Sequence, residues 1–174
     1  MGGTIGVESK QGVGTTYTIT LPFAVDNTAT AEPEQQTDLT VLQGRRLLLA
    51  EDNALNMEIV EFLLNEVGVK VTKAANGQQA VEAFAASPVG GFDAILMDVM
   101  MPVRDGHEAT RAIRAMDRPD AKTIPIFAMT ANAFTEDRRK ALESGMNEHL
   151  TKPIDPDTLY RLLVKYLTDP KSNL

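Results

Sequence analysis

The chain has 174 residues, of which 43% are hydrophobic and 24% charged, and it carries a formal net charge of −7 with no cysteine. This length supports one well-buried domain with appendages, the negative charge argues against a polyanionic partner such as nucleic acid, and the lack of cysteine excludes disulfides and thiolate metal sites. No apolar run reaches the roughly 18 residues of a membrane span and no signal peptide is recognisable, so we expect a soluble chain.

Residues 1–25 are predicted to form two short strands around a glycine turn. Thr4–Glu8 and Thr16–Leu21 have the residue types of strands, and Gly12–Thr15 supplies the turn. The glycines open no helix, which argues against a phosphate-binding loop. Because an isolated hairpin is only marginally stable in water, this segment is expected to belong to something larger.

Residues 26–44 are rich in Thr, Ala, Glu and Gln and contain few side chains that a core would bury. This composition is typical of a flexible linker. We expect an acidic, solvated strip with no chemistry of its own.

Residues 45–168 alternate between strand and helix patterns. Strands are expected at 46–50, 70–74, 92–98, 124–130 and 148–151, and helices at 55–67, 77–86, 106–116, 134–144 and 156–167. Strict alternation predicts a five-stranded parallel sheet with helices on both faces, which is a doubly wound α/β fold. Residues 169–174 remain as a tail.

Polar residues stand at the C-terminal ends of four of the predicted strands: Glu51 and Asp52 follow the first, Asp98 ends the third, Thr130 ends the fourth and Lys152 follows the fifth. The C-terminal ends of parallel strands meet at one edge of the sheet, where sites form. A carboxylate that ends a buried strand, as Asp98 does, is a candidate nucleophile. We therefore expect these five side chains to gather around Asp98.

Three carboxylates in one crevice would repel one another unless a cation lies between them. Oxygen ligands without cysteine or a well-placed histidine favour a hard ion such as Mg²⁺, which is often completed by substrate phosphate. A metal beside an ammonium and a hydroxyl suits phosphoryl transfer. The residues therefore predict a magnesium-dependent phosphoryl-transfer site.

Four segments, in this order and spacing, resemble the receiver domain of two-component response regulators: LLLAEDN, ILMDVMMPVRDGHEATRAIR, AMTANAF and HLTKPID. The resemblance covers about residues 45–168 and implies a flavodoxin-like (βα)5 fold with Mg²⁺ as cofactor. It implies these roles: Asp98 as the phosphoacceptor, Asp52 as a direct Mg²⁺ ligand, Glu51 as a ligand largely through water, the Met100 carbonyl as a further ligand, and Thr130 and Lys152 as contacts of the phosphoryl oxygens. It also implies a cis Lys152–Pro153 bond, which proline permits at modest cost.

The resemblance further implies a switch, in which the Thr130 hydroxyl moves toward the phosphoryl group and makes space for an aromatic side chain three residues before Lys152. That position holds His149, where the family usually has Tyr or Phe. The departure weakens the inference, and a partly exposed strand histidine is the alternative interpretation. Arg104 is a second departure, in a loop where the family usually has an apolar residue.

The other histidine, His107, stands before a glutamate, as does the phosphorylated histidine of a kinase dimerisation helix. The Arg-Thr-Pro sequence that should follow is missing. We therefore expect a surface histidine and no phosphohistidine donor in this chain.

The helix at residues 55–67 is apolar on more than one side. On a helical wheel one arc is assigned to the core, and it contains Leu55, Ile59, Phe62, Leu63 and Val67. Met57, Val60 and Leu64 lie between this arc and the polar side. We expect this second stripe to dock a histidine-phosphotransfer helix bundle near Asp98, as family members do, and a wide core face is the alternative.

Within residues 1–25, the segment GGTIGVESKQGVGTTYTITLPF resembles the closing strands of the ATP-binding domain of sensor histidine kinases. The nucleotide-binding segments of that domain would lie upstream, so we expect no ATP binding here. The two resemblances together imply part of a hybrid histidine kinase: an ATPase remnant at 1–25, a linker at 26–44, a receiver at 45–168 and a tail at 169–174. A cytoplasmic location is expected, with a parent protein that can be anchored in the membrane.

The implied function is acceptance of a phosphoryl group from a phosphohistidine, expected in the same parent chain, and its relay to a phosphotransfer partner. The enzyme status stays open, because kinase parts are lacking while a receiver catalyses its own phosphorylation. One alternative is a docking module without phosphotransfer. Another is an aspartyl phosphatase, which usually has a second Asp where Met100 stands. A flavodoxin-like cofactor binder would need a Ser/Thr/Gly-rich loop where residues 51–53 read Glu-Asp-Asn.

Overall fold

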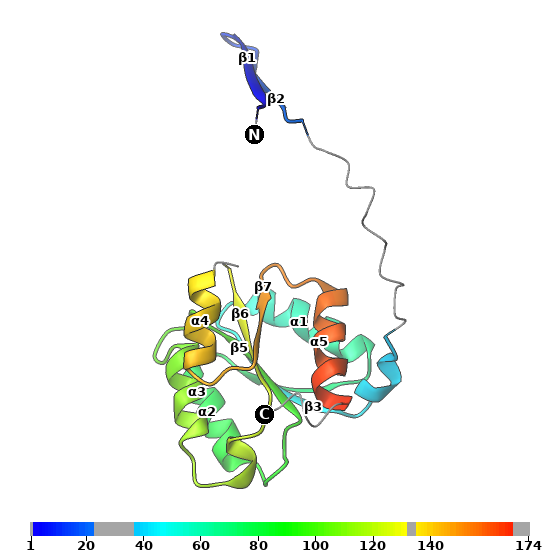
Figure 1. Cartoon of the computed structure of the whole chain (residues 1–174), viewed down its shortest axis with the longest axis vertical. Helices are drawn as coiled ribbons and strands as arrows, with labels where there is room; N and C mark the ends of the chain where they lie inside the picture. Colours follow the sequence, from blue (N-terminus) through cyan, green and yellow to red (C-terminus); the bar gives the residue numbers. More distant parts are fainter. Residues whose placement is uncertain (1, 23–36, 132–134, 169–174) are drawn as a thin grey trace. The chain divides into compact units, whose positions relative to one another are not determined.

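The structure is a computed structural model that describes residues 2–22, 37–131 and 135–168, without the side chains of residues 135–137. The chain divides into two compact units, Met1–Gln36 and Thr37–Leu174 (Figure 1). Within the described ranges, no helix combines the length and the apolar character that crossing a membrane requires.

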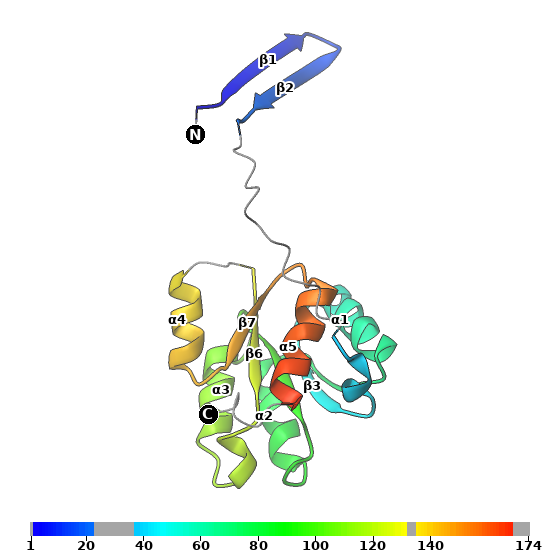
Figure 2. The ribbon, with the colours of Figure 1, turned by 45° about the vertical axis from the view of Figure 1, so that its right-hand side comes forward.

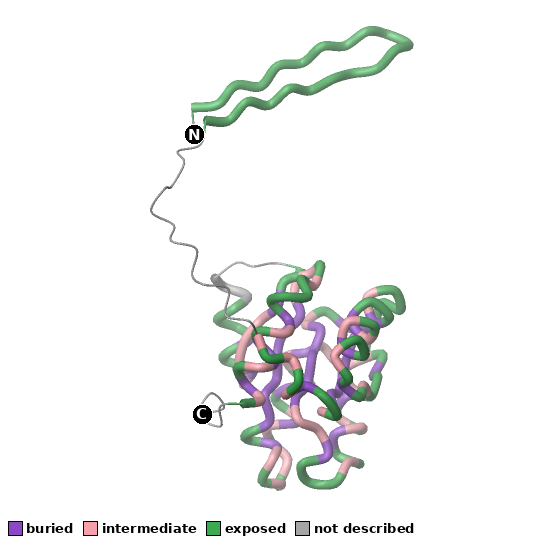
Figure 3. The backbone as a smooth tube through the Cα atoms, turned by 90° about the vertical axis from the view of Figure 1, so that its right-hand side faces the viewer, coloured by how far each residue is buried: buried purple, intermediate pink, exposed green. Residues whose placement is uncertain are grey.

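The N-terminal unit contains an antiparallel hairpin of β1 (Thr4–Lys10) and β2 (Gly14–Thr20), so the predicted hairpin is confirmed. Side chains alternate between the faces of a strand, and Val7 and Tyr17 therefore share one face with the neighbouring pair of isoleucines. Every residue of both strands is exposed (Figure 3). The hairpin thus carries an apolar face that nothing in the described part of its unit covers.

The second unit is built on a five-stranded parallel sheet with the order β4-β3-β5-β6-β7. The strands are β3 (Arg46–Ala50), β4 (Lys70–Ala74), β5 (Ala94–Asp98), β6 (Ile126–Thr130) and β7 (Glu148–Thr151). The central strand β5 is buried along its whole length, whereas the edge strand β4 is mostly exposed. This order explains why the middle strand is an unbroken apolar run and the edge strand is not.

Helices cover both faces of this sheet (Figures 1 and 2). They are α1 (Ala54–Glu66), α2 (Gly77–Ala86), α3 (Gly106–Arg114), α4 (Thr135–Glu143) and α5 (Pro156–Thr168), with short 3₁₀ helices η1 (Leu39–Leu42) and η2 (Pro119–Ala121). One core lies between the sheet and α1, α5 and η1, and the other lies under α2, α3 and α4. The predicted five-stranded, doubly wound α/β fold is therefore confirmed.

Alternation along the strands divides their side chains between the two cores. Leu47 and Leu49 of β3 point into the core under α1 and α5, while Leu48 points into the core under α2 and α3. In the first of these cores, the rings of Phe127 and Tyr166 meet edge to face with centroids 5.0 Å apart. Such burial on both faces stabilises the strands that deliver the site residues.

Two predictions about the ends and faces of elements are wrong. The segment 26–44 was expected to be entirely linker, but η1 lies within it and Leu42 is fully buried against the core that contains α5. Because η1 packs against α5, the folded unit begins at about residue 37, earlier in the chain than the predicted start at residue 45. The second wrong prediction is the assignment of the buried and exposed faces of α1. The predicted helix at 134–144 begins outside the described residues, and its described part is α4.

Candidate functional site

The C-terminal ends of the strands bring the predicted site residues to one edge of the sheet. Asp98 is the last residue of β5 and only 4% exposed, and Glu51, directly after β3, is 1% exposed. Asp52, the next residue, is exposed. The parallel register pairs Ala50 with Met97, which places the two loops side by side. The expectation that these carboxylates converge is confirmed.

Lys152 lies between the two buried carboxylates. Its Nζ is 2.7 Å from Asp98 Oδ2 and 2.6 Å from Glu51 Oε2, and its side chain is largely buried. The backbone N–H of Lys152 donates to the Thr130 carbonyl at 2.8 Å, which fixes the start of this loop against the end of β6. The predicted cis peptide bond between Lys152 and Pro153 is present.

The electrostatics of these three groups follow from burial and close pairing. Burial raises the pKa of Asp98, the hydrogen bond from Lys152 opposes that rise, and the Glu51 charge adds to it. Burial alone would lower the pKa of Lys152, but hydrogen bonds and charge from Asp98 and Glu51 outweigh it, and the pKa is raised. Lys152 is therefore a persistent cation at neutral pH, which compensates for two carboxylates that would otherwise repel each other.

Further contacts orient the carboxylates. The Asn56 amide on α1 donates to Glu51 Oε1 at 3.1 Å, and the Met100 backbone N–H donates to Asp98 Oδ1 at 3.2 Å. Asn53 accepts hydrogen bonds from Leu55 and Asn56 N–H groups and so caps α1. Asn56 was not among the site residues predicted from the sequence. The sequence signal for its role was its place three residues after Asn53, the N-cap of α1 that directly follows Glu51 and Asp52.

The acidic cluster has the composition of a site for a hard divalent cation. Glu51, Asp52 and Asp98 each offer a carboxylate oxygen, and these oxygens lie within 4.8 Å of one another. All three are oxygen donors, as Mg²⁺ prefers. Glu51 Oε2 is buried and, within the described part of the chain, is compensated only through its ion pair with Lys152. The donor set therefore fits Mg²⁺.

Two other predicted residues lie near this edge. Thr130 ends β6 beside β5, one residue after the register partner of Asp98, and is half-buried. Met100 follows Asp98 by two residues, and its side chain is exposed, so any ligand role belongs to its backbone carbonyl.

The histidines occupy different places. The His149 ring in β7 is partly exposed and lies 3.1 Å from Glu148 Oε1, in agreement with the alternative interpretation of a partly exposed strand histidine. His107 was expected at the surface but is partly buried, and its Nδ1 lies 3.1 Å from Ser144 Oγ. Arg104 contributes its backbone carbonyl, which accepts from the Gly77 N–H at the start of α2.

The predicted docking stripe on α1 is wrong, because Met57, Val60 and Leu64 are the buried residues of this helix. They pack in the core beside β3 and α5. The residues assigned to the core arc include three that are instead exposed on the surface: Leu55, Ile59 and Phe62, of which Phe62 is 62% exposed. Spaced at i, i+4 and i+7, these three form one stripe, named here the α1 stripe.

The α1 stripe is continuous with the site. A small hollow of about 30 Å³ is lined by residues that include Ile59 of the stripe, Glu51, Asn56 and Lys152 of the site, and Pro153. An apolar surface that reaches the edge of a buried charged site is suited to a partner that must approach that site.

Comparison with known proteins agrees with this geometry. Residues 47–164 match the family model described as the response regulator receiver domain. The chain is 38% identical over 135 residues to hybrid signal transduction histidine kinase I of Dictyostelium discoideum, covering 74% of this chain and 8% of that protein. It is 35% identical over 160 residues to the sensor protein EvgS of Escherichia coli K12, covering 91% of this chain and 13% of that protein. The chain thus spans only a small part of these curated relatives.

Two solved structures are informative. The receiver domain of a sensor histidine kinase from Pseudomonas aeruginosa PAO1, with a magnesium ion coordinated in its active-site cleft, has a TM-score of 0.66 and 41% identity, covering 72% of this chain and 99% of that one. A Saccharomyces cerevisiae co-crystal structure of the histidine phosphotransfer protein Ypd1 with the receiver domain of its downstream response regulator Ssk1 has a TM-score of 0.65 and 30% identity, covering 76% of this chain and 93% of that one.

Proposed function

The chain belongs to the response regulator receiver family, and from this we propose that it accepts a phosphoryl group on Asp98 from a phosphohistidine and relays it to a histidine-phosphotransfer partner. One observation carries the proposal. The Lys152 ammonium lies 2.7 Å from Asp98 and 2.6 Å from Glu51, at the edge where Asp52 adds a third carboxylate.

In the proposed step an Asp98 oxygen attacks the phosphorus atom of the donor. A phosphorus–oxygen bond forms while the phosphorus–nitrogen bond breaks, and the imidazole nitrogen keeps the electron pair and takes a proton from solvent. Lys152 is held where it can neutralise charge on the phosphoryl oxygens. The Met100 N–H fixes the orientation of the attacking carboxylate through its bond to Oδ1.

Glu51, Asp52, Asp98 and the backbone carbonyl of Met100 would hold Mg²⁺, with Asp52 as the direct ligand and Glu51 acting largely through water. When bound, this ion supplies charge neutralisation at the phosphoryl oxygens. Asn56 keeps Glu51 directed toward the site through the 3.1 Å bond. A magnesium-bound receiver with 41% identity supports this assignment.

Thr130 is proposed to contact a phosphoryl oxygen through its hydroxyl and to shift toward it after transfer, with His149 as the coupled position three residues before Lys152. The support is positional, because Thr130 ends the strand beside β5. His149 is the register partner of Ala128, two residues before Thr130, so the two positions proposed for the switch lie on adjacent strands.

The α1 stripe is proposed as the surface that receives the phosphotransfer partner, in place of the buried Met57, Val60 and Leu64. Leu55, Ile59 and Phe62 expose apolar surface, and Ile59 also lines the hollow that borders Glu51 and Lys152. A partner helix could cover such an i, i+4, i+7 stripe while bringing a histidine to Asp98. A yeast receiver with 30% identity forms a complex with a phosphotransfer protein, which supports this class of partner.

The parent protein is proposed to be a hybrid histidine kinase with a cytoplasmic receiver and with its donor histidine in the same chain. Relatives such as EvgS are several times longer than this chain. The exposed apolar face of β1 and β2 supports the assignment of residues 1–25 to the end of an ATP-binding domain, since a two-stranded sheet needs a larger body to bury such a face.

Acetyl phosphate labelling tests the proposed function. We expect the protein incubated with Mg²⁺ and acetyl phosphate to gain one phosphate by intact mass spectrometry, and this phosphate to be released by hydroxylamine as an acyl phosphate would be. EDTA should abolish the labelling, because Lys152 alone then faces the phosphoryl oxygens while the carboxylates of Glu51 and Asp52 are left without a metal ion.

Matched variants locate the modification. Asp98→Asn should remove it, whereas Asp117→Asn, at an exposed position, should leave it unchanged. Phosphate retained in Asp98→Asn, or turnover of bulk phosphoester in place of a stoichiometric adduct, would overturn the assignment in favour of another acceptor or a phosphatase. No labelling of the wild type would indicate a docking module.

A further inference from the structure

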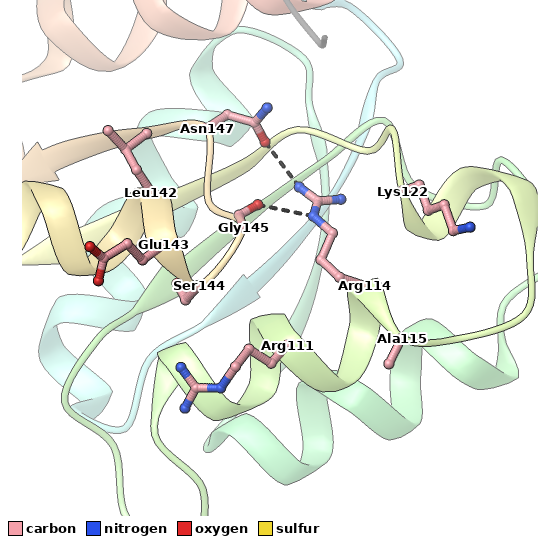
Figure 4. Close-up of a pocket in the computed structure, with 9 residues that line it drawn as sticks. All are labelled: Arg111, Arg114, Ala115, Lys122, Leu142, Glu143, Ser144, Gly145 and Asn147. Carbon is pink, nitrogen blue, oxygen red and sulfur yellow. Dashed lines mark hydrogen bonds between the residues drawn. The ribbon is translucent and has the colours of Figure 1, made fainter.

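A second concave surface lies at the edge of the sheet opposite to Asp98. It is an open groove of about 600 Å³ between the C-terminal end of α3 and the connection from α4 to β7 (Figure 4). Asn147, which lines it, precedes β7 and accepts a hydrogen bond from the N–H of Ile126, the first residue of β6. The groove is therefore at the N-terminal ends of the strands, away from the phosphorylation site.

Three cations line this groove without carboxylate partners. Arg111 and Arg114 lie one turn apart on α3, and Lys122 lies in the connection before β6, so that Arg114 stands between the other two (Figure 4). Arg111 and Lys122 are exposed. Among the residues that the structure describes, none of the three forms an ion pair, although the chain as a whole carries a net charge of −7.

Arg114 is the fixed centre of the group. Its guanidinium donates to the Gly145 carbonyl at 2.9 Å, to the Ala121 carbonyl at 2.8 Å and to Asn147 Oδ1 at 3.0 Å. These neutral acceptors use three of its five N–H groups, so two remain for another acceptor. Burial lowers the pKa of Arg114 to about 10, which leaves it charged at neutral pH. A half-buried cation without an anion is stabilised when an anion enters.

The one carboxylate in the lining does not cancel this charge. Glu143 forms an ion pair with Arg139 at 2.6 Å, and its side chain is more than half exposed. In Figure 4 its carboxylate is directed away from Arg114. Around Arg114 the lining consists of Gly145, Asn147 and Ala115, none of which carries a net charge.

We propose that the groove formed by Arg111, Arg114 and Lys122 binds a small phosphate-bearing ligand, at a site separate from Asp98. Guanidinium groups match phosphate oxygens in geometry and charge, and Arg114 is already held in place by three hydrogen bonds. Arg114 of α3 already donates hydrogen bonds to Gly145 and Asn147, which lie in the segment between α4 and β7. A phosphate bound to Arg114 would therefore lie where α3 meets that segment.

Pyrophosphate is the probe that tests this site, with EDTA present so that the acidic cluster holds no metal. In ¹⁵N-edited NMR spectra we expect saturable shifts of the backbone amides of Ala115, Gly145 and Asn147. The double variant Arg111→Ala with Lys122→Ala changes only exposed side chains, and we expect it to weaken binding about tenfold, or ~1.4 kcal/mol. Lys70→Ala, an exposed lysine on the edge strand β4, should leave the affinity unchanged.

Several results would overturn the proposal. One is amide shifts that do not saturate with added pyrophosphate, and another is shifts confined to amides around Met100 and Thr130. A third is an affinity of the double variant for pyrophosphate equal to that of the wild type. Citrate at matched ionic strength distinguishes phosphate recognition from a general response to polyanions, and equal binding of citrate would refute the proposed ligand class. Acetyl phosphate labelling of Asp98 should be the same in the double variant and the wild type, so this test and that of the proposed function fail independently.

Discussion

Replacing Leu64 and Phe62 separately should change two different properties of the protein. Leu64 of α1 is fully buried in the core that contains α5, whereas Phe62, two residues earlier, is 62% exposed. Truncating a buried leucine to alanine costs about 2–5 kcal/mol, because the transfer free energy is lost and a cavity remains. At about 3–5 °C per kcal/mol for a domain of this size, Leu64→Ala should lower Tm by roughly 6–25 °C.

Phe62→Ala should leave the free energy of unfolding within about 1 kcal/mol of wild type, since an exposed side chain leaves no cavity. It should instead weaken phosphotransfer to the partner, by about tenfold if the ring is a central contact of that interface. Labelling of Asp98 by acetyl phosphate needs no partner, so it should be unaffected by Phe62→Ala.

The assays are thermal and urea unfolding, acetyl phosphate labelling, and transfer from the phosphorylated receiver to a phosphotransfer domain. Ile5→Ala, an exposed apolar residue on the hairpin, is a control for general loss of surface hydrophobicity. If Phe62→Ala unfolds as readily as Leu64→Ala, the assignment of the two α1 faces is wrong. If its transfer rate equals that of wild type, the α1 stripe is not the docking surface.

Three further predictions concern the site and the stability of its surroundings. Lys152→Met should slow acetyl phosphate labelling about 100-fold or more, because it removes the cation that faces Asp98; a rate within a few-fold of wild type would show that this ammonium is dispensable. Gly106→Ala should destabilise the domain and impair labelling together, since an added Cβ would collide with the Asp98 carbonyl, and a variant with wild-type Tm would contradict this. Hydrogen bonds from Arg118 lower the pKa of Asp120 to about 2 from an ordinary 3.8. The ionised Asp120 therefore contributes to the free energy of unfolding above pH 4, and this contribution is lost as pH falls toward 2. Asp120→Asn should therefore cost about 1–2 kcal/mol at pH 7, and its stability difference from wild type, followed by urea unfolding, should narrow between pH 4 and pH 2 rather than stay constant.

The site residues could be predicted from the sequence because the end of each strand is marked by neighbouring residues in the chain. Asp98 closes an apolar run and Lys152 follows a short strand, and parallel topology requires such ends to meet. The roles of the metal ligands came from the family resemblance. The contact of Asn56 with Glu51 did not follow from either, because it depends on how the first turn of α1 lies over the loop.

The α1 faces show where periodicity fails. Apolar residues occur on both sides of this helix, so the pattern alone has two solutions. Packing against β3 and α5 selected Met57, Val60 and Leu64 for the core and left Leu55, Ile59 and Phe62 outside. Similarly, Leu42 is surrounded in sequence by linker-like residues, and its burial depends on α5, which is more than 110 residues away in the chain.

The sequence by itself determined the alternation of strands and helices, the parallel sheet, and the set of residues gathered at its C-terminal edge. These features depend on neighbours in the chain and on the rule that parallel strands share one direction. Tertiary structure decided which side of α1 is buried, where the folded unit begins, and that Arg114 meets neutral acceptors from separate segments. Such features depend on contacts between residues distant in sequence, and no local pattern specifies their energies.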